Sequence, residues 1–336
     1  MTPGYRSADP TECGSVSDLT IATTADMDRP HFIHSDERTW PETNCYLDLC
    51  IETVHRLGHD PLPMLGAGLA ADHDGEQWTF VKPDPDDIRA LYGLHITEEN
   101  VWRPVLDTIE SGPARGLLFT VEVDSWWLPD TAGTDYRSGH VKTTIVPVSV
   151  DRELHVMDYI HNAGLYRLSG DDFAGIFNLN PKSEWVLLPY IEQIRRVRPD
   201  ADESGDLAVR LARKHLDRAP SSNPVDRLGA GVIDALTWLP AAGIATFHSW
   251  AFATLRQCGA TAEVAADFAT YLDTHGAPSA GAAREPFLAV ATNAKSIQFK
   301  MARAANGRKV NVDDALDALS ARWAEAMEIL DSAVPR

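Results

Sequence analysis

The change in sequence character near residue 182 constrains the fold more than any other feature of this chain. Before it, from about residue 29, segments with the 3.6-residue helical period alternate with segments rich in β-branched and aromatic residues. After it, long segments rich in Ala and Leu follow one another, separated by breaks such as RAPSSNP and HGAPSAG. The sequence therefore predicts an α+β domain at 29–181 followed by an all-helical C-terminal domain at 182–336. The segments expected to be helical in the second domain are 183–197, 206–216, 225–239, 244–255, 261–272 and 312–330.

Composition and charge exclude several classes of function. Residues 1–28 are rich in Ser, Thr, Asp, Gly and Pro and lack the basic and apolar segments of a secretion signal, so we expect a flexible leader. The 30 Lys and Arg against 49 Asp and Glu leave a net charge of -19, which repels nucleic-acid phosphates. No apolar run approaches the roughly 18 residues typical of a membrane-spanning helix. Four cysteines without CxxC spacing are typical of a reducing compartment. We therefore expect a cytoplasmic protein that binds neither nucleic acid nor a membrane.

The first domain contains one well-marked helix and several strands. Apolar positions at helical spacing predict a helix over 45–57, ending before Gly58. The run DPDDIRALYGL begins with acidic residues, as a helix N-terminus does. The segments expected to contain strands are 116–128, 140–150 and 153–160, followed by a strand end, a turn and a short helix in 161–177 capped by Ser169 or Asp171.

Cys45 lies where the first helix begins. Thr43 or Asn44 is a suitable N-cap, which places Cys45 in the first turn, off the apolar stripe. There the free N–H groups and the helix dipole favour a thiolate and lower the pKa of a thiol. Cys45 is therefore a candidate nucleophile, and the alternative is a small half-buried residue at a helix start. Cys50, on the apolar stripe, is expected to be a buried thiol.

A thiol nucleophile needs a base and a group that orients the base. His140 opens the strand-like run HVKTTIVPV, and the next strand ends in DYIHNAG. A histidine at the start of one strand and an amide or acid at the end of its neighbour can meet, so we expect His140 to be the base. Asn162 is the first choice for the orienting group and Asp158 the second. The alternatives are a strand-edge histidine and an asparagine that forms a turn.

Two family resemblances support this arrangement. The run from Val121 to Gly164, with its V-D-x-x-x-L-P segment, its spacer and its strand-opening histidine, resembles the core of the butirosin-H N-terminal domain family. The cysteine of that family likewise opens an early helix that ends near a glycine. The stretches WPETNCY, LPDTAGTDY and HNAG also resemble a bacterial family often encoded near aminoacyl carrier-protein ligases, over most of residues 35 to 180.

The resemblance implies a papain-like cysteine acyltransferase. Such an enzyme moves an aminoacyl group from the phosphopantetheine thioester of a carrier protein to an amine acceptor, and needs no cofactor of its own. By position, Cys45 would be the nucleophile, His140 the base and Asn162 the orienting group, an amide in place of the usual acid. A cysteine hydrolase (peptidase, amidase or thioesterase) and a non-catalytic protein that binds a carrier protein are the alternatives, because the acceptor depends on pocket shape and water exclusion.

Further residues around this triad receive secondary assignments. The oxyanion would be stabilised by the backbone N–H of Cys45 and one side-chain donor, for which Asn44 is a candidate besides its capping duty. Asp124 either recognises a substrate amine or ends a strand, and Trp126 is a candidate pocket wall. The cysteine and histidine spacings match no zinc motif, and no GxGxxG follows a strand, so we expect neither a metal nor a dinucleotide.

A locally basic stretch interrupts the acidic composition. The runs EQIRRVRPD and RLARKHLDR place several arginines close together. They either form solvated helix faces or a docking surface for an acidic carrier protein, of which Arg195, Arg196 and Arg198 would be part. The C-terminal helices either cover the active site or form the contact of a homodimer.

Overall fold

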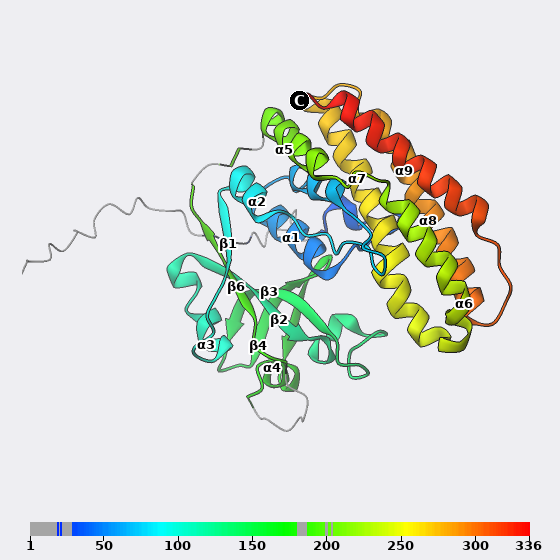
Figure 1. The fold of residues 1–336 in the computed structure, drawn as a ribbon. Helices are drawn as coiled ribbons and strands as arrows, with labels where there is room; N and C mark the ends of the chain where they lie inside the picture. The colour runs from blue at the N-terminus through cyan, green and yellow to red at the C-terminus, as the bar shows by residue number, and fades with distance from the viewer. Residues whose placement is uncertain (1–18, 20, 22–28, 180–186, 199–200, 203) are drawn as a thin grey trace, which may run out of the picture.

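A computed structural model describes residues 19, 21, 29–179, 187–198, 201–202 and 204–336. Figure 1 shows a sheet with short helices in the first half of the chain and long helices in the second half. The mixed α+β character and the helical C-terminal region are therefore as predicted.

One antiparallel sheet organises the first half. Its strands are β1 (Leu94–Glu98), β2 (Leu117–Asp124), β3 (Lys142–Asp151), β4 (Val156–His161), β5 (Gly164–Ser169) and β6 (Ile191–Arg196), in the spatial order β1-β6-β2-β3-β4-β5. The strands expected in 116–128, 140–150 and 153–160 are present. The first ends at Asp124, because the next three residues, Ser125–Trp127, form a turn of 3-10 helix (η4).

Strand β6 corrects one prediction and moves the expected boundary. The segment 183–197 was expected to be helical, and its described part instead contains a strand that pairs with β1 and β2. Ile191 and Ile194 are three residues apart and therefore face opposite sides of the sheet, each in a different apolar core. A central strand buried on both faces lacks the alternating pattern that identifies a strand. The sheet therefore ends near residue 196 rather than 181.

The first predicted helix is confirmed as α1 (Cys45–Arg56), followed by Gly58 with φ of 85°. The second is α2 (Pro85–Tyr92). The short helix in 161–177 is α4 (Asp171–Ile176), whose N-cap is Gly170 rather than Ser169 or Asp171. The remaining helical segments of this half are η1 (Phe32–His34), η2 (Leu62–Ala70), α3 (Val105–Glu110), η3 (Pro113–Arg115) and η5 (Pro129–Thr131).

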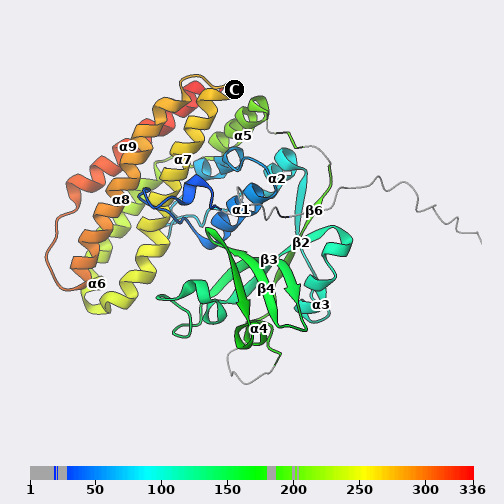
Figure 2. The same cartoon turned by 180° about the vertical axis from the view of Figure 1, so that it is seen from behind.

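Long helices make up the C-terminal half, and α7, α8 and α9 pack side by side (Figure 2). The stretch Pro224–Thr274 is apolar and long enough to cross a membrane by length and composition, with 22% of its most apolar window buried. A single such stretch is weak evidence for a membrane span, although none was expected. Gly243 interrupts it with a non-helical backbone, and the chain reverses there (Figure 1). The elements are α5 (Gly205–Arg218), α6 (Pro224–Ala251), the π-helical turn η6 (Phe252–Arg256), α7 (Gln257–Thr274), η7 (Ala280–Ala283), α8 (Arg284–Ala305) and α9 (Asp313–Ala333).

The two halves share one apolar core. Helix α1 lies between the sheet and the C-terminal helices in both views (Figures 1 and 2). Leu47 and Ile51 of α1 belong to the same buried cluster as Ile160 of the sheet and Phe268 of α7. Folding of the C-terminal helices therefore stabilises the position of α1.

Candidate functional site

Cys45 is the first residue of α1 and is half-buried. Asn44 is the N-cap, since its side-chain oxygen accepts hydrogen bonds from the backbone N–H groups of Tyr46 and Leu47 at 3.2 and 2.9 Å. Thr43 is fixed by Asp48, whose carboxylate accepts hydrogen bonds from the Thr43 backbone at 2.9 and 3.1 Å. The predicted position of Cys45 in the first helical turn is therefore confirmed.

The C-terminal helices hold the segment that leads to Cys45. Gln257, the first residue of α7, donates a hydrogen bond to the Thr43 carbonyl at 3.3 Å and accepts one from Asn44 at 3.4 Å. Further back, Glu263 accepts hydrogen bonds from the backbone N–H groups of Thr39 and Trp40. Gln257 directly follows η6, and π-helical turns often occur at functional sites. These contacts could not be predicted from the sequence, because the partners are more than 200 residues apart.

The acidity of the Cys45 thiol differs from the expectation. Burial raises the pKa of the Cys45 thiol above its ordinary value, although Lys142 and the Thr143 hydroxyl act in the opposite direction. The thiol is therefore protonated at neutral pH, and a proton acceptor must remove its proton before it can attack. Burial also raises the pKa of Cys50, which is enclosed in the core as predicted.

A histidine that the sequence reasoning did not select lies behind Thr143. The Thr143 hydroxyl is 2.8 Å from Nε2 of His161, the last residue of β4. Nδ1 of His161 is 2.5 Å from Oδ2 of Asp130, and the other oxygen of Asp130 accepts a hydrogen bond from the Tyr159 hydroxyl. Thr143, which lowers the pKa of the Cys45 thiol, is thus hydrogen-bonded to His161, and His161 to Asp130. We call these four residues the relay.

Members of the relay occur in stretches that carry the family resemblance. Asp130 belongs to LPDTAGTDY, and His161 opens HNAG, directly before the residue chosen as orienting group. The missed signal was the histidine beside Asn162. The alternation of buried strand residues did not distinguish it from an ordinary core histidine.

The predicted base, His140, forms a second histidine–aspartate pair. Its Nδ1 is 2.7 Å from Oδ2 of Asp124, the last residue of β2. The indole of Trp126 stacks on the imidazole with ring centroids 4.6 Å apart and an angle of 15° between the planes. We call these three residues the open pair, because the His140 side chain is 35% exposed, against 2% for His161.

The orienting group of His140 is therefore Asp124, which corrects the assignment to Asn162 or Asp158. Asp158 forms an ion pair with Arg167 at 2.6 Å and accepts a hydrogen bond from Ser149. Asn162 has a φ of 44° in the turn between β4 and β5, as a turn-forming asparagine does. Asp124 also ends β2 and accepts a hydrogen bond from the Trp126 backbone, as expected for a residue that ends a strand.

The amide of Asn44 is occupied by other partners. It donates hydrogen bonds to the Val81 carbonyl at 3.0 Å and to Gln257, so it is not placed to donate to a substrate oxyanion. The backbone N–H of Cys45 makes no hydrogen bond recorded among the described residues. It remains the candidate donor at the helix N-terminus.

The relay and the open pair lie at the same end of the sheet. Val123 pairs with Thr143, and Asp124 pairs with Lys142. Because successive strand residues face opposite sides, Thr143 and Lys142 direct their side chains to opposite faces. Both residues lower the pKa of the Cys45 thiol, and α1 packs against the same strand.

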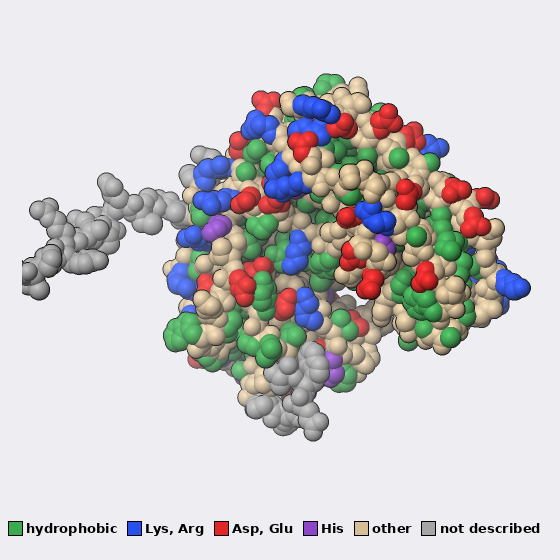
Figure 3. Space-filling model, in the orientation of Figure 1, with side chains coloured by type: hydrophobic (Ala, Val, Ile, Leu, Met, Phe, Trp, Pro, Cys, Tyr) green, Lys and Arg blue, Asp and Glu red, His purple; other side chains and the backbone are tan. Residues whose placement is uncertain are grey.

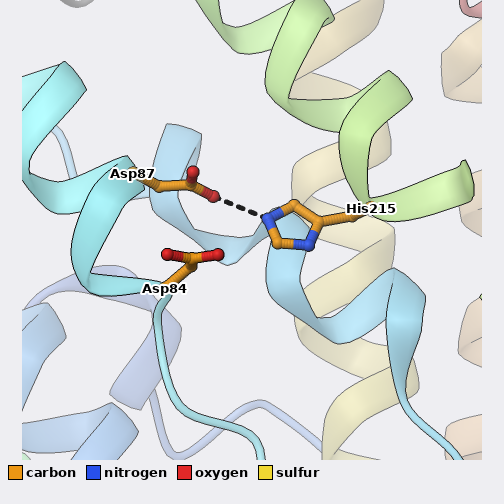
Figure 4. Close-up of side chains that lie close together, drawn as sticks. All are labelled: Asp84, Asp87 and His215. Carbon is orange, nitrogen blue, oxygen red and sulfur yellow. Dashed lines mark hydrogen bonds and ion pairs between the residues drawn. The ribbon is translucent and has the colours of Figure 1, made fainter. Parts of the chain in front are cut away.

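One cluster among the described residues has the composition of a metal site. Figure 4 shows Asp84 and Asp87 beside His215, whose Nε2 is 2.6 Å from Asp87. Lys214 already pairs with both carboxylates, and Arg218 pairs with Asp84 at 2.9 Å. These ion pairs connect α2 to α5 and already neutralise both carboxylates, so a metal ion would have to compete with Lys214 and Arg218.

Two surface features lie apart from Cys45. Lys and Arg side chains gather over β1 and β6 (Figure 3), where Arg195 contacts His95 and Arg198 donates to the Ala90 carbonyl. Arg195 pairs with Leu117, the first residue of β2, whereas Asp124 is the last, about 23 Å away along the strand. A groove of about 420 Å³ between α6 and α9 is lined by none of the predicted site residues.

Two family descriptions match this chain. Residues 29–196 match the DUF1839 N-terminal domain, and residues 201–332 match the DUF1839 C-terminal domain. The boundary between them coincides with the end of β6. No curated protein matches the chain.

Proposed function

The chain belongs to the DUF1839 family, and from this premise we propose that it is a cysteine-dependent acyltransferase with Cys45 as nucleophile. The observation that carries the proposal is the relay, which connects a half-buried thiol at a helix N-terminus to an oriented imidazole. The papain-like fold and the likeness to butirosin H suggested by the sequence are part of this proposal. Their support is the order of a helix-opening cysteine followed by strands that carry histidines.

Formation of the acyl-enzyme uses the relay. Asp130 accepts the Nδ1–H of His161, which leaves Nε2 as the basic nitrogen facing Thr143. As the Cys45 sulfur attacks a thioester carbonyl, its proton passes to the Thr143 oxygen and the Thr143 proton passes to Nε2. The resulting imidazolium is stabilised by Asp130 and keeps the proton, while the donor is expelled as a thiolate that takes up a proton from solvent. The S–C bond to Cys45 replaces the S–C bond of the donor, so the step costs little bond energy.

The donor and acceptor follow from the resemblance. We propose an aminoacyl carrier protein as donor and a small amine as acceptor, with the basic residues over β1 and β6 as the docking surface. The chain has a net charge of -19, so an acidic partner is repelled by most of its surface and attracted by the basic residues over β1 and β6. Phosphopantetheine would enter with the carrier protein, and its arm would have to follow the strands to reach Cys45.

Acyl-adduct formation tests the proposal. Incubation with the alanyl thioester of N-acetylcysteamine should add one alanyl group to the intact protein, measured by mass spectrometry. Cys45→Ala should abolish the adduct, while Cys50→Ala, which removes an enclosed thiol five residues away, should retain it. An adduct that persists in Cys45→Ala contradicts the proposal. Release of free alanine despite an added amine would instead favour the hydrolase, and binding of a carrier protein without any adduct would favour the non-catalytic alternative.

A further inference from the structure

The structure contains two histidine–aspartate pairs at one end of the sheet, although one thiol needs only one base. The His161 side chain is 2% exposed and Thr143 is 6% exposed, so a second substrate cannot reach the imidazole of the relay. The amine that attacks the acyl-enzyme must nevertheless lose a proton to a group that it can touch. The open pair offers such a group.

We propose that His140 is the base for the acceptor amine, while the relay serves only the Cys45 thiol. This inference rests on the proposed function and adds a division of labour to it. His140 is 35% exposed, and its Nδ1–H is held by Asp124, which leaves Nε2 as the basic nitrogen. Asp124 is a positioning residue, because it acts through His140.

The register of the strands places the open pair near the reacting sulfur. Asp124 lies opposite Lys142 at the start of β3, the strand against which α1 packs, and Lys142 and its neighbour Thr143 both lower the pKa of the Cys45 thiol. Cross-strand partners have Cβ atoms about 5 Å apart, so His140 and the thiol lie around the same strand ends. Trp126 stacks on the imidazole and limits its rotation. His140 thus approaches the acyl group from the face opposite the relay.

The proposed step balances in protons and bonds. The amine nitrogen attacks the acyl carbon of the Cys45 thioester and forms a C–N bond while the C–S bond breaks. The proton lost by the amine passes to Nε2 of His140 and from there to solvent. The departing Cys45 sulfur takes back a proton through Thr143 from the imidazolium of His161. The chain returns to its starting state, and the product is an amide.

A two-step experiment separates acylation from transfer. The acyl-enzyme is formed with the alanyl thioester of N-acetylcysteamine, freed of excess donor, and then mixed with glycinamide or with hydroxylamine. In His140→Gln, acylation should proceed at the wild-type rate while transfer to glycinamide falls about 10²-fold or more. Transfer to hydroxylamine, which attacks without strong assistance from a base, should fall far less. Asp124→Asn should show the same pattern, with transfer to glycinamide reduced far more than transfer to hydroxylamine.

His155→Gln is the matched control, because His155 is a partly exposed histidine in the turn between β3 and β4, at the other end of these strands from Thr143 and His161. It should leave both steps unchanged. If His140→Gln forms the acyl-enzyme and passes it to glycinamide as fast as wild type, the division of labour is wrong and the acyltransferase proposal stands. If His140→Gln fails to form the acyl-enzyme, His140 acts on the thiol and the division is also wrong. If wild type forms no adduct on Cys45, both proposals fail.

Discussion

The relay and the open pair contain the same two residue types in opposite environments. In the relay, His161 and Asp130 are 2% and 5% exposed, and their contacts extend through buried hydroxyls to Cys45 and Tyr159. In the open pair, Asp124 is enclosed but His140 faces solvent, with an indole against its ring. An enclosed imidazole can exchange protons only with its fixed partners, whereas an exposed one can meet a diffusing substrate.

Burial, more than residue type, therefore distinguishes the two pairs and is the basis of the roles proposed for them. The relay is suited to a single internal proton transfer, since its groups are preorganised and exclude water. The open pair is suited to an external partner that changes from one turnover to the next. In the proposed mechanism, the thiol is protonated at rest, in accordance with its raised pKa, and is activated through the relay.

Of the substitutions that separate the relay from the open pair, Asp130→Asn is expected to have the largest effect on acyl-enzyme formation. The amide can present an N–H to Nδ1 and stabilise the wrong tautomer, so that Nε2 no longer accepts the proton relayed by Thr143. Acyl-enzyme formation should fall by about 10²- to 10⁴-fold, measured by the rate of mass increase with the alanyl thioester. Asp124→Asn should leave that rate within about a factor of three, because it acts on the second step.

Tyr159→Phe serves as the control for Asp130→Asn. It removes the donor to the other carboxylate oxygen while keeping the carboxylate and the ring volume. We expect a decrease in acylation of only several-fold. If Asp130→Asn and Asp124→Asn reduce the rate of acyl-enzyme formation equally, the two histidine–aspartate pairs do not have separate roles.

Thr143→Val is the next largest change expected. Valine preserves the shape of threonine but removes the hydroxyl that joins the thiol to His161. Acylation should fall by about 10- to 100-fold, and alkylation of Cys45 by iodoacetamide at pH 8 should also become slower, because a hydrogen bond that favours the thiolate is lost. Thr143→Ser keeps the hydroxyl and should restore most of both rates. If valine leaves acylation unchanged, the proton reaches a base without Thr143.

Sequence reasoning recovered the parts of the site that depend on local pattern. The N-cap, the helix-opening Cys45 and the strands that begin near His140 and end near His161 follow from capping, periodicity and β-branched runs. The helical character of the second half followed from composition, whereas β6 was assigned to the wrong element. Its apolar residues serve both faces of a central strand, and only pairing with β1 and β2 decides that conformation.

Partners of the histidines and the environment of the thiol depend on long-range packing. Asp124 was considered for a substrate amine, and it instead accepts from His140, because a loop of 15 residues brings that histidine back to the end of β2. Asp130 received no assignment, since a short turn between two strands carries no periodic signal. The thiol was expected to be acidic from its helix position alone, but its burial, which the sequence does not show, raises its pKa instead.

Asp48→Asn is expected to have the smallest effect of these substitutions. It tests how burial changes the acidity of a third carboxyl group, besides those of Asp130 and Asp124. Asp48 is 1% exposed beneath Cys45, and burial raises its pKa to about 8. Between the unfolded value near 4 and this value, the native chain binds one proton more than the unfolded chain, so stability falls as pH rises. From pH 6.5 to 8 the loss should reach about 2 kcal/mol, seen as a falling midpoint of thermal unfolding. Asparagine, which still accepts a hydrogen bond from Thr43, should remove most of that slope.

The pH range above 7 separates Asp48 from the other buried groups whose pKa is strongly shifted. Burial lowers the pKa of His31 to about 3 and of His34 to about 4, so these two destabilise the native chain only as pH falls below about 6.5. Burial raises the pKa of Glu52 to about 7, which adds to the loss of stability only up to that pH. Above pH 7 the slope should therefore belong to Asp48. If Asp48→Asn and wild type lose stability in parallel from pH 7 to 8, the carboxyl beneath Cys45 is already ionised there, and enclosure at this helix start is weaker than in the relay.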